Sequence, residues 1–292
     1  IDSMGIMELI GFLEQQFALP QSTYLDFVSA AATTNDTNRI GALRSRLFIN
    51  ALHGEDQLRQ RVAFALSQIM VISMQDSGVG EQPRAVAAYV DMLADKGLAN
   101  YRDLLEGVST HPLMGRYLSH LRNQKADPRT GRVPDENYAR EVMQLFSIGL
   151  HELNADGSQK LNGSTPVDTY GEVDIAGLAR VFTGWSYACP EWPDNSCFFS
   201  GSANGVSDPD RWFKPMQGYP QYHSTEAKTF LGKTIAVQST SDPRVSLKEG
   251  LDALAAHPNV GPFIGKQLIQ RLVTSNPSPA YVSAVAAAFN DA

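Results

Sequence analysis

The sequence predicts a mainly helical, all-α fold. We expect a single large domain over residues 1–292, with a long irregular, aromatic-rich insertion at 150–246 and room for one short β-hairpin. Two observations predict this fold. Apolar residues recur at helical spacing through the first 150 residues and again from residue 247 to the end. Between these stretches that spacing is lost, and Gly, Pro, Asn, Asp and aromatic residues are frequent.

The first part of the chain contains a series of predicted helices. Leu9, Leu13 and Phe17 keep helical spacing up to Pro20, and Ser22 is a suitable N-cap for a second segment. Further segments with helical spacing cover 38–52, 54–73, 82–96 and 101–109.

The segment 54–73 carries the strongest helical signal. Glu55 and Asp56 fall in its first turn, where the helix dipole favours acidic side chains. Its second half is apolar on nearly every side, so we expect this helix in the core.

The insertion contains one predicted turn and one predicted helix. Asn-Ala-Asp-Gly at 154–157 predicts the turn of a short hairpin. The helix covers 172–183, and Gly184 is its stop signal. Irregular chain of this length is usually either functional or disordered, but its aromatic residues predict an ordered layer over the helices. These are Trp185, Trp192, Phe198, Phe199, Trp212, Phe213, Tyr219 and Tyr222.

Composition excludes two classes of protein. The chain has 24 Lys and Arg against 31 Asp and Glu, a formal net charge of −7, which argues against a nucleic-acid binder that neutralises phosphates. No apolar run approaches the roughly 20 residues of a membrane-spanning helix, so we expect no transmembrane segment. The chain begins at Ile1 without the basic and apolar regions of a signal peptide. We expect it to be a fragment of a longer chain.

Cys189 and Cys197 are the two cysteines, and the segment between them is rich in Pro, Asn, Asp and Ser. Such a loop is a poor place for buried thiols, so a disulfide is the preferred interpretation and two free thiols the alternative. On the loop-entropy model the bond would stabilise the fold by about 2–3 kcal/mol. Because it would require an oxidising compartment, we expect an extracytoplasmic protein: periplasmic, cell-surface or secreted.

Two His-Pro pairs form a weak internal repeat. His111-Pro112 and His257-Pro258 each follow a Leu-rich helix and open another. Pro is favoured at the first helical position and pushes the preceding residue out of helical geometry. The structural interpretation therefore places each His at a helix joint, where its ring bonds free backbone groups. The alternative is a shared catalytic or metal-binding role.

The most informative segment is the predicted helix at 134–146. At 100° per residue its polar residues fall on one side, and the apolar residues Tyr138, Val142, Leu145 and Phe146 fall on the other. The polar set is Glu136, Asn137, Arg140, Glu141 and Gln144.

Two interpretations fit this polar face. It can be a solvated surface on which a Glu136–Arg140 ion pair stabilises the helix by about a few tenths of a kcal/mol. Alternatively it forms the wall of a cleft, where Arg140 keeps one carboxylate ionised while burial raises the pKa of the other. The helix would then carry both an acid and a base.

His223 is a second candidate for chemistry, because it lies in the loop-rich layer where functional residues are over-represented. The alternative is an ordinary hydrogen-bonding residue. Asn137, Trp185 and Lys228 are the candidates for binding. The sequence lacks HExxH, CxxCH, paired CxxC, GxGxxG, phosphate-loop and GxSxG motifs. No cofactor is therefore predicted, although a metal is left open.

Six blocks follow one another over nearly the whole chain. They are DQLRQRVAFALSQ at 56–68, His-Pro at 111–112, ENYARE at 136–141, ARVFTGW at 179–185, the segment 223–232 and His-Pro at 257–258. Together they resemble the bacterial family known as domain of unknown function number 1800. The resemblance implies a mostly helical secreted protein, often fused to surface or carbohydrate-associated modules and commonly encoded beside a second exported protein. It implies no reaction.

The chain departs from the family pattern at two places. Asp135 stands where the family usually has Asn, and Gln144 where it has a further Glu. After His223 the family usually has Asp and then Gly, but Ser224 and Glu226 occupy those positions. The second departure puts any His–Asp chemistry in doubt.

Three functional hypotheses follow. The first is an extracytoplasmic enzyme acting on a polymeric or carbohydrate substrate, with Glu136 and Glu141 as acid and base, Arg140 as the orienting charge and His223 as an auxiliary. The second is a non-catalytic surface or scaffold protein that binds another exported protein. The third is metal-dependent chemistry through His111, His223 and His257, which no ligand spacing supports.

Overall fold

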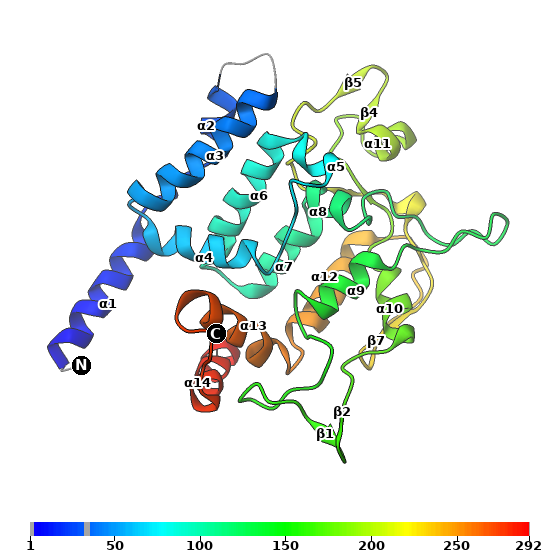
Figure 1. Ribbon diagram of the computed structural model, residues 1–292. Helices are drawn as coiled ribbons and strands as arrows, with labels where there is room; N and C mark the ends of the chain where they lie inside the picture. The colour runs from blue at the N-terminus through cyan, green and yellow to red at the C-terminus, as the bar shows by residue number, and fades with distance from the viewer. Residues whose placement is uncertain (1–2, 32–35, 292) are drawn as a thin grey trace. The chain divides into compact units, whose positions relative to one another are not determined.

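The computed structural model describes residues 3–31 and 36–291 (Figure 1). The chain forms two compact units, Ile1–Leu104 and Leu105–Ala292. In the described residues about half of the chain is helical, in fourteen α-helices, with eight short strands in four antiparallel pairs. The mainly helical fold is therefore confirmed. The expectation of one hairpin is corrected to four strand pairs, and the single-domain expectation stays a prediction.

The first unit consists of helices. They are α1 (Ser3–Ala18), α2 (Leu25–Ala30), α3 (Asp36–His53), α4 (Gln57–Ser67), α5 (Ser77–Gly80) and α6 (Pro83–Lys96), followed by α7 (Tyr101–Thr110), which crosses into the second unit. Helix α6 lies at the centre of the unit, in contact with α2, α3, α4 and α5. Its buried face includes Val86, Tyr89 and Leu93. The predicted helices at 82–96 and 101–109 match α6 and α7 closely.

The helix predicted at 54–73 is shorter than expected. It begins at Gln57 and ends at Ser67, and the backbone N–H groups of Gln68 and Ile69 then bond carbonyls three residues back, in a tighter turn. That turn places Ile69 and Met70 in the core. The predicted burial holds for these residues, whereas Phe64, on the same helix, is exposed.

Asp56 is not part of the first turn of α4. It lies just before the helix and is fully buried, and its carboxylate accepts hydrogen bonds from the backbone N–H of Ser22 (3.0 Å) and from Gln60 (2.9 Å). The Asn50 amide bonds the Ser22 carbonyl oxygen from α3 (2.9 Å). These side chains hold the α1–α2 connection against α3 and α4. Their role is thus to satisfy buried backbone groups.

The second unit mixes helices with short strand pairs. Its helices are α8 (Pro112–Tyr117), α9 (Asn137–Gln144), α10 (Glu172–Ala179), α11 (Asn195–Ser200), the 3₁₀ turn η1 (Pro220–Tyr222), α12 (Pro243–Ala255), α13 (Val260–Leu272) and α14 (Pro279–Asn290). The strand pairs are β1–β2 (Leu161–Asn162, Thr165–Pro166), β3–β6 (Trp185–Ser186, Gln217–Gly218), β4–β5 (Ser202–Ala203, Val206–Ser207) and β7–β8 (Lys228–Phe230, Lys233–Ile235).

The strand pairs lie in the segment that was expected to be irregular. The β4–β5 turn has Asn204 and Gly205 with φ of 51° and 76°, and the β7–β8 turn has Leu231 and Gly232 with φ of 50° and 72°. Two successive residues at positive φ form the turn that suits a right-twisted hairpin, and Asn-Gly is its preferred sequence.

The predicted disulfide between Cys189 and Cys197 is present, and its Cα atoms are 5.7 Å apart. Both cysteines are buried, in a cluster with Phe198 and Tyr219. The ring of Tyr222 stacks on Phe198, with ring centroids 3.9 Å apart. Some aromatic residues of this segment are therefore buried in a cluster and others are exposed. Sequence composition alone could not tell which would be buried.

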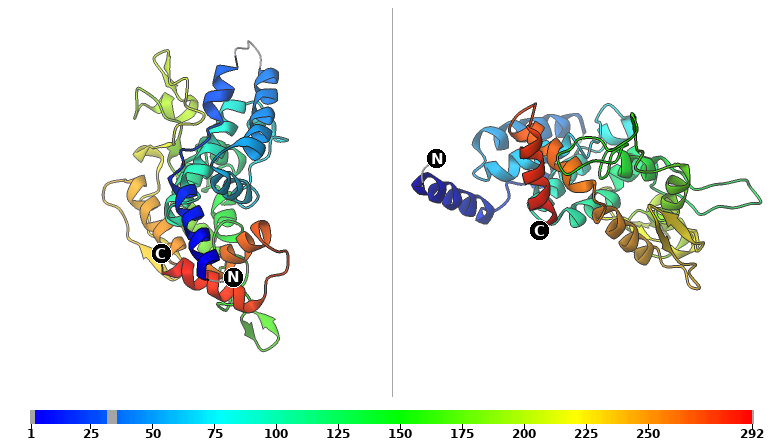
Figure 2. Two further views of the ribbon diagram at one scale, coloured as in Figure 1. Left: turned by 90° about the vertical axis from the view of Figure 1, so that its left-hand side faces the viewer. Right: turned by 90° about the horizontal axis from the view of Figure 1, so that it is seen from below.

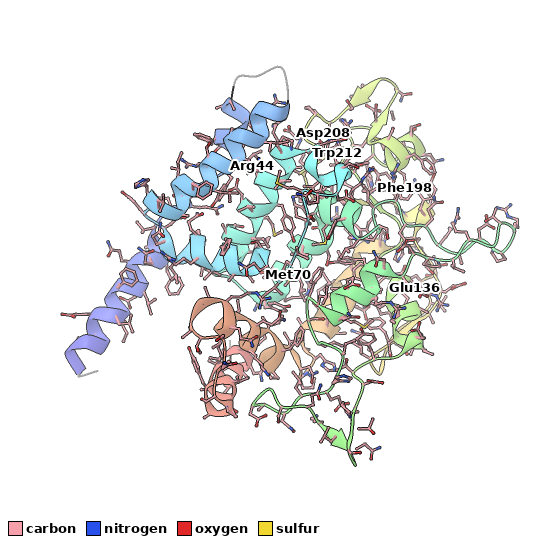
Figure 3. The ribbon with its side chains drawn as sticks, in the orientation of Figure 1. Arg44, Met70, Glu136, Phe198, Asp208 and Trp212 are labelled. Carbon is pink, nitrogen blue, oxygen red and sulfur yellow. A yellow bond between two sulfur atoms is a disulfide. The ribbon has the colours of Figure 1, made fainter. Side chains whose placement is uncertain are left out.

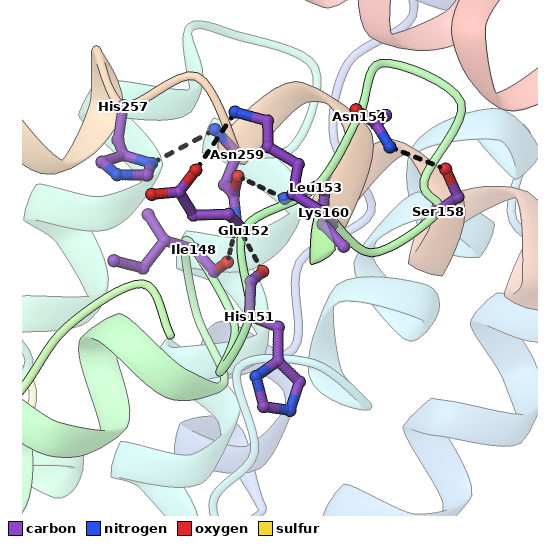
Figure 4. Close-up of polar contacts among 9 residues, drawn as sticks. All are labelled: Ile148, His151, Glu152, Leu153, Asn154, Ser158, Lys160, His257 and Asn259. Atoms are coloured by element: carbon purple, nitrogen blue, oxygen red, sulfur yellow. Dashed lines mark hydrogen bonds and ion pairs between the residues drawn. The ribbon is translucent and has the colours of Figure 1, made fainter. Parts of the chain in front are cut away.

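One asparagine fixes the chain that follows α9 (Figure 4). The buried side chain of Asn259, just before α13, donates to the carbonyl oxygens of Ile148 and His151 (both 2.8 Å) and accepts from the backbone N–H of Leu153 (2.9 Å). The predicted turn at 154–157 follows, closed by a hydrogen bond from the Gly157 N–H to the Asn154 carbonyl (2.9 Å).

Replacing Asn259 with Ala is expected to destabilise the second unit by about 2–4 kcal/mol, since one buried and two partly buried backbone groups lose their buried partner. Asn154→Ala is the matched control, because its amide bonds an exposed Ser158 hydroxyl (3.0 Å) and its loss should cost under about 1 kcal/mol. Urea unfolding followed by tryptophan fluorescence measures both. Equal effects of the two variants would contradict the anchoring role of Asn259.

Within the described ranges, no helix is long and apolar enough to cross a membrane.

Candidate functional site

The polar helix predicted at 134–146 is α9, and the residue before it fixes where it begins. The Asp135 carboxylate accepts from the backbone N–H of Asn137 and from the Ser119 hydroxyl (both 2.9 Å). The Asn123 side chain pairs with the Asp135 backbone in both directions, at 2.8 and 3.0 Å. Asp135 therefore serves to hold the start of this helix.

The apolar face of α9 is buried as predicted, except at Leu145, which is exposed at the end of the helix. Tyr138 packs in an aromatic cluster with its ring centroid 3.8 Å from that of His120 and 4.7 Å from that of Phe182. Its hydroxyl shares a hydrogen bond with Ser109 (2.7 Å). This anchoring fixes the rotation of α9, so the opposite face carries the polar side chains outward (Figure 3).

Arg140 pairs with a residue that sequence spacing did not indicate. Its guanidinium lies 3.4 Å from both carboxylate oxygens of Glu172, at the start of α10. The predicted Glu136–Arg140 pair is therefore corrected to Arg140–Glu172. The hydrogen bond to Glu172 raises the pKa of Arg140, but because Glu172 is 78% exposed and Arg140 38% exposed, the pair adds little to stability.

Glu136 and Glu141 flank Arg140 and are both partly buried. Among the residues that the structure describes, neither carboxylate has a hydrogen bond or ion pair. Burial raises the pKa of Glu141, against the opposing effect of the Arg140 charge. Five residues of helix separate the two by about 7.5 Å along its axis.

A tyrosine adds a hydroxyl to this face. The Tyr170 hydroxyl donates to the side-chain oxygen of Gln144 (3.1 Å), and burial raises the pKa of Tyr170. Tyr170 and Glu172 together bring the chain before α10 along the polar face of α9. Neither was found from sequence, because they follow α9 by more than twenty residues and belong to no recognised motif.

The three binding candidates lie in different surroundings. Asn137 is exposed at the first turn of α9. Trp185 is buried, its backbone paired with Gly218 in β3–β6, so its ring offers no surface for stacking. Lys228 is fully buried in β7, and its amine donates to the carbonyl oxygen of Glu226 (3.2 Å). Burial, with the Arg180 charge, lowers the pKa of Lys228 to about 8.

His223 is fully buried, and both of its ring nitrogens are engaged. Nδ1 donates to the carbonyl oxygen of Thr183 (2.7 Å), and Nε2 accepts from the Ser246 hydroxyl (2.9 Å). Burial lowers the pKa of His223 to about 4, so the ring is neutral at pH 7. In this conformation His223 joins α12 to the chain after α10, and it presents no nitrogen to solvent.

The His-Pro pairs confirm the structural interpretation. Nδ1 of His111 accepts from the backbone N–H of Leu113, and Nδ1 of His257 accepts from that of Asn259, both at 3.2 Å. In each case the ring bonds the N–H two residues ahead, at the entrance to a helix. No group of three or more His, Cys, Asp or Glu side chains within the described part of the chain is arranged to hold a metal ion.

An exposed aromatic residue lies on the disulfide-closed loop. Trp192 is 45% exposed although its indole N–H is bonded to the Gly218 carbonyl (2.9 Å). The Gln221 amide donates to the Pro193 carbonyl (2.9 Å) and to the Asn195 side chain (3.2 Å), which ties the loop to η1. Trp192 is therefore held in a fixed position with part of its ring in solvent.

Chemically, the α9 face offers a carboxyl group with a raised pKa, a second carboxylate and a fixed cation between them. A carboxyl group with a raised pKa can donate a proton near neutral pH, and an unpaired carboxylate can accept one.

Comparison with known proteins identifies one family. The model of the family described as "Protein of unknown function (DUF1800)" matches residues 2–292. No curated protein and no solved structure matches the chain.

Proposed function

We propose that this chain, which belongs to the DUF1800 family, is a carboxylate-dependent enzyme that acts outside the cytoplasm on a polymeric substrate such as a polysaccharide. One observation carries the proposal. Glu136 and Glu141 are partly buried on one helix face and neither is paired, while the arginine between them is held by Glu172. Carboxylates with a purely structural role are usually hydrogen-bonded when buried.

The two carboxylates have different roles in this proposal. Glu141 is the acid, because burial raises its pKa above that of an ordinary glutamate. Glu136 is the base that activates water. Inverting hydrolases hold two such carboxyl groups roughly 6.5–9.5 Å apart with a water between them, and the proposal assigns that arrangement to Glu136 and Glu141. Arg140, held by Glu172, supplies the positive charge between the two carboxyl groups.

Trp192 supports a polymeric sugar as the substrate. The faces of sugar rings carry C–H groups that pack on aromatic rings, and an indole already held by its own hydrogen bond loses little freedom on binding. The amides of Asn195 and Gln221 lie on the same loop and η1, where they offer hydrogen bonds to hydroxyl groups.

The disulfide supports a location outside the cytoplasm. Disulfides such as Cys189–Cys197 form and persist in oxidising compartments and are rare in the cytosol.

The experiment is a screen of the purified chain on soluble and insoluble polysaccharides for release of reducing ends. Glu136→Gln and Glu141→Gln are expected to lower kcat at least about 100-fold without unfolding the chain. Glu81→Gln is the matched control: an exposed glutamate of the first unit, outside the α9 face, whose loss should leave kcat unchanged. Wild-type rates in both glutamine variants would overturn the proposal.

A second candidate function is binding of another exported protein without catalysis. The observation that favours it is the loop between α8 and α9, which extends away from the rest of its unit (Figure 1). An isolated antiparallel β-bridge pairs the backbones of Asp127 and Arg132 in this loop. The loop presents exposed Arg129 and Val133. Loss of partner binding in an Arg129→Ser, Arg132→Ser double variant, with normal binding by Glu141→Gln, would establish this function.

A further inference from the structure

Helix α1 carries an apolar stripe on its outer side. At 100° per residue four of its exposed residues fall within about 80° of one another. They are Met7, Ile10, Glu14 and Phe17, here called the α1 stripe. The helix has two acidic residues and no basic one. A helix with this many large apolar side chains is normally covered.

On the opposite side, Gln16 attaches the C-terminal part of α1 to its own unit, while Leu9 and Phe12 on that side are each 50% exposed. The Gln16 side chain donates to the Glu55 carbonyl (3.2 Å) and accepts from the backbone N–H of Leu58 (3.0 Å), at the start of α4. Within the unit α1 extends past this attachment point rather than along α3 (Figures 1 and 2). The α1 stripe is thus free to contact another surface.

Helix α3 carries a second apolar stripe. Its inner side buries Leu43 and Asn50, while its outer side exposes Phe48 by 71% and Leu52 by 72%. The exposed residues that share this side are Arg44, Leu47, Phe48 and Leu52, here called the α3 stripe. Each stripe therefore combines three apolar side chains with one charge, and the two charges have opposite sign.

The spacings of three residues in each stripe match when the helices run antiparallel. With Glu14 opposite Arg44, a rise of 1.5 Å per residue puts Ile10 opposite Phe48, each about 6 Å further along. Met7 then lies opposite Leu52, about 10–12 Å from the charge pair. A parallel arrangement aligns the charges but leaves Ile10 and Met7 beyond the end of the α3 stripe.

We propose that two copies of this chain pair through these stripes, with α1 of each copy lying antiparallel along α3 of the other. The contact then occurs twice about a two-fold axis, the usual symmetry of homodimers. Twelve apolar side chains, each burying about 100 Å², give an interface on the order of 1,200 Å². That area lies at the lower edge of stable specific interfaces. The proposal does not rest on any catalytic activity.

The first test is the mass of the chain in solution by analytical ultracentrifugation over micromolar concentrations. The wild type is expected to be a dimer, and Phe48→Asp is expected to raise Kd at least tenfold. Phe64→Asp is the matched control, because Phe64 is 67% exposed on α4 and belongs to neither stripe. A monomeric wild type, or equal effects of the two variants, would overturn the proposal.

Charge reversal tests the pairing itself. Glu14→Arg and Arg44→Glu should each raise Kd several-fold, because like charges would then face each other. The double variant should return Kd to near the wild-type value. A double variant as weak as the two single changes combined would overturn the register.

Cross-linking tests the register and the second copy together. The two cysteines of the chain are bonded to each other, so introduced thiols have no competitor. Ile10→Cys with Phe48→Cys is expected to give a covalent dimer on mild oxidation. An intramolecular cross-link in a monomer would instead show that α1 folds back on its own α3, and it would overturn the proposal.

Discussion

Replacing Gly177 with Ala is expected to prevent stable folding of the second unit. Gly177 lies in α10 where the helix contacts β7, and a Cβ atom there would overlap the carbonyl oxygen of Thr229 and lie 2.7 Å from its carbonyl carbon. The obstacle is backbone that pairs with β8. The neighbouring Phe230 is fully buried. Because neither strand nor helix can withdraw without losing core contacts, we expect a loss above about 4 kcal/mol.

Gly41→Ala is the matched control for this prediction. Gly41 lies in α3, and a Cβ atom there meets nothing within 4 Å, so the change should stabilise the first unit by about 0.5–1 kcal/mol. Urea unfolding followed by circular dichroism measures both variants. A Gly177→Ala protein within about 1 kcal/mol of wild type would show that α10 and β7 do not pack as described.

Acid is expected to destabilise the second unit well above the pH at which most carboxylates titrate. His111, His120 and His223 are buried, and burial lowers the pKa of His111 to about 3 and the pKa values of His120 and His223 to about 4. In the unfolded chain each titrates near 6.5. Below pH 6.5 the unfolded state therefore binds more protons than the folded one.

This difference in proton binding makes the free energy of unfolding fall as the pH falls. The three groups contribute their full stability above pH 6.5 and lose it as the pH falls toward 4, at about 1.4 kcal/mol per pH unit each. The combined slope near pH 5 is on the order of 3–4 kcal/mol per pH unit. All three tryptophans lie in this unit. Tryptophan fluorescence during urea unfolding at pH 7.5, 6.5, 5.5 and 4.5 therefore measures how the stability of the second unit changes with pH.

His120→Phe isolates one of the three contributions. A phenyl ring can keep the stack on Tyr138, and the hydrogen bond from His120 Nε2 to the Ser109 carbonyl (2.8 Å) is lost at every pH. The variant should therefore be less stable at pH 7.5 but show a slope smaller by about 1.4 kcal/mol per pH unit. A wild-type slope near zero between pH 6.5 and 4.5 would contradict the burial of these rings.

Sequence patterns predicted the elements whose determinants are local. The helices α6 and α7 and the polar helix α9 follow from apolar spacing within a single segment. The disulfide follows from the composition of the short loop between Cys189 and Cys197. The histidines at the two His-Pro joints follow from proline geometry, because each ring bonds an N–H only two residues away. One local signal was overlooked: Asn204-Gly205, the turn of β4–β5.

The remainder depends on contacts between distant segments. Arg140 pairs with Glu172, thirty-two positions further on, rather than with Glu136 one turn away. Of the aromatic residues assigned to one layer, Trp185 is buried while Trp192 is exposed. The helix predicted at 54–73 ends at Ser67, because tertiary packing turns the chain there. Propensity and periodicity cannot specify these choices.

The most direct test of the proposed acid is the rate of reducing-end release by the wild type and by Glu141→Gln on one polysaccharide, across pH 4 to 8. Loss of the protonated carboxyl is expected to lower kcat at least about 100-fold throughout this range and to remove the fall in rate at high pH. Both proteins should unfold at the same urea concentration. Equal rates and identical pH profiles for the two proteins would contradict the assignment of Glu141 as the proton donor.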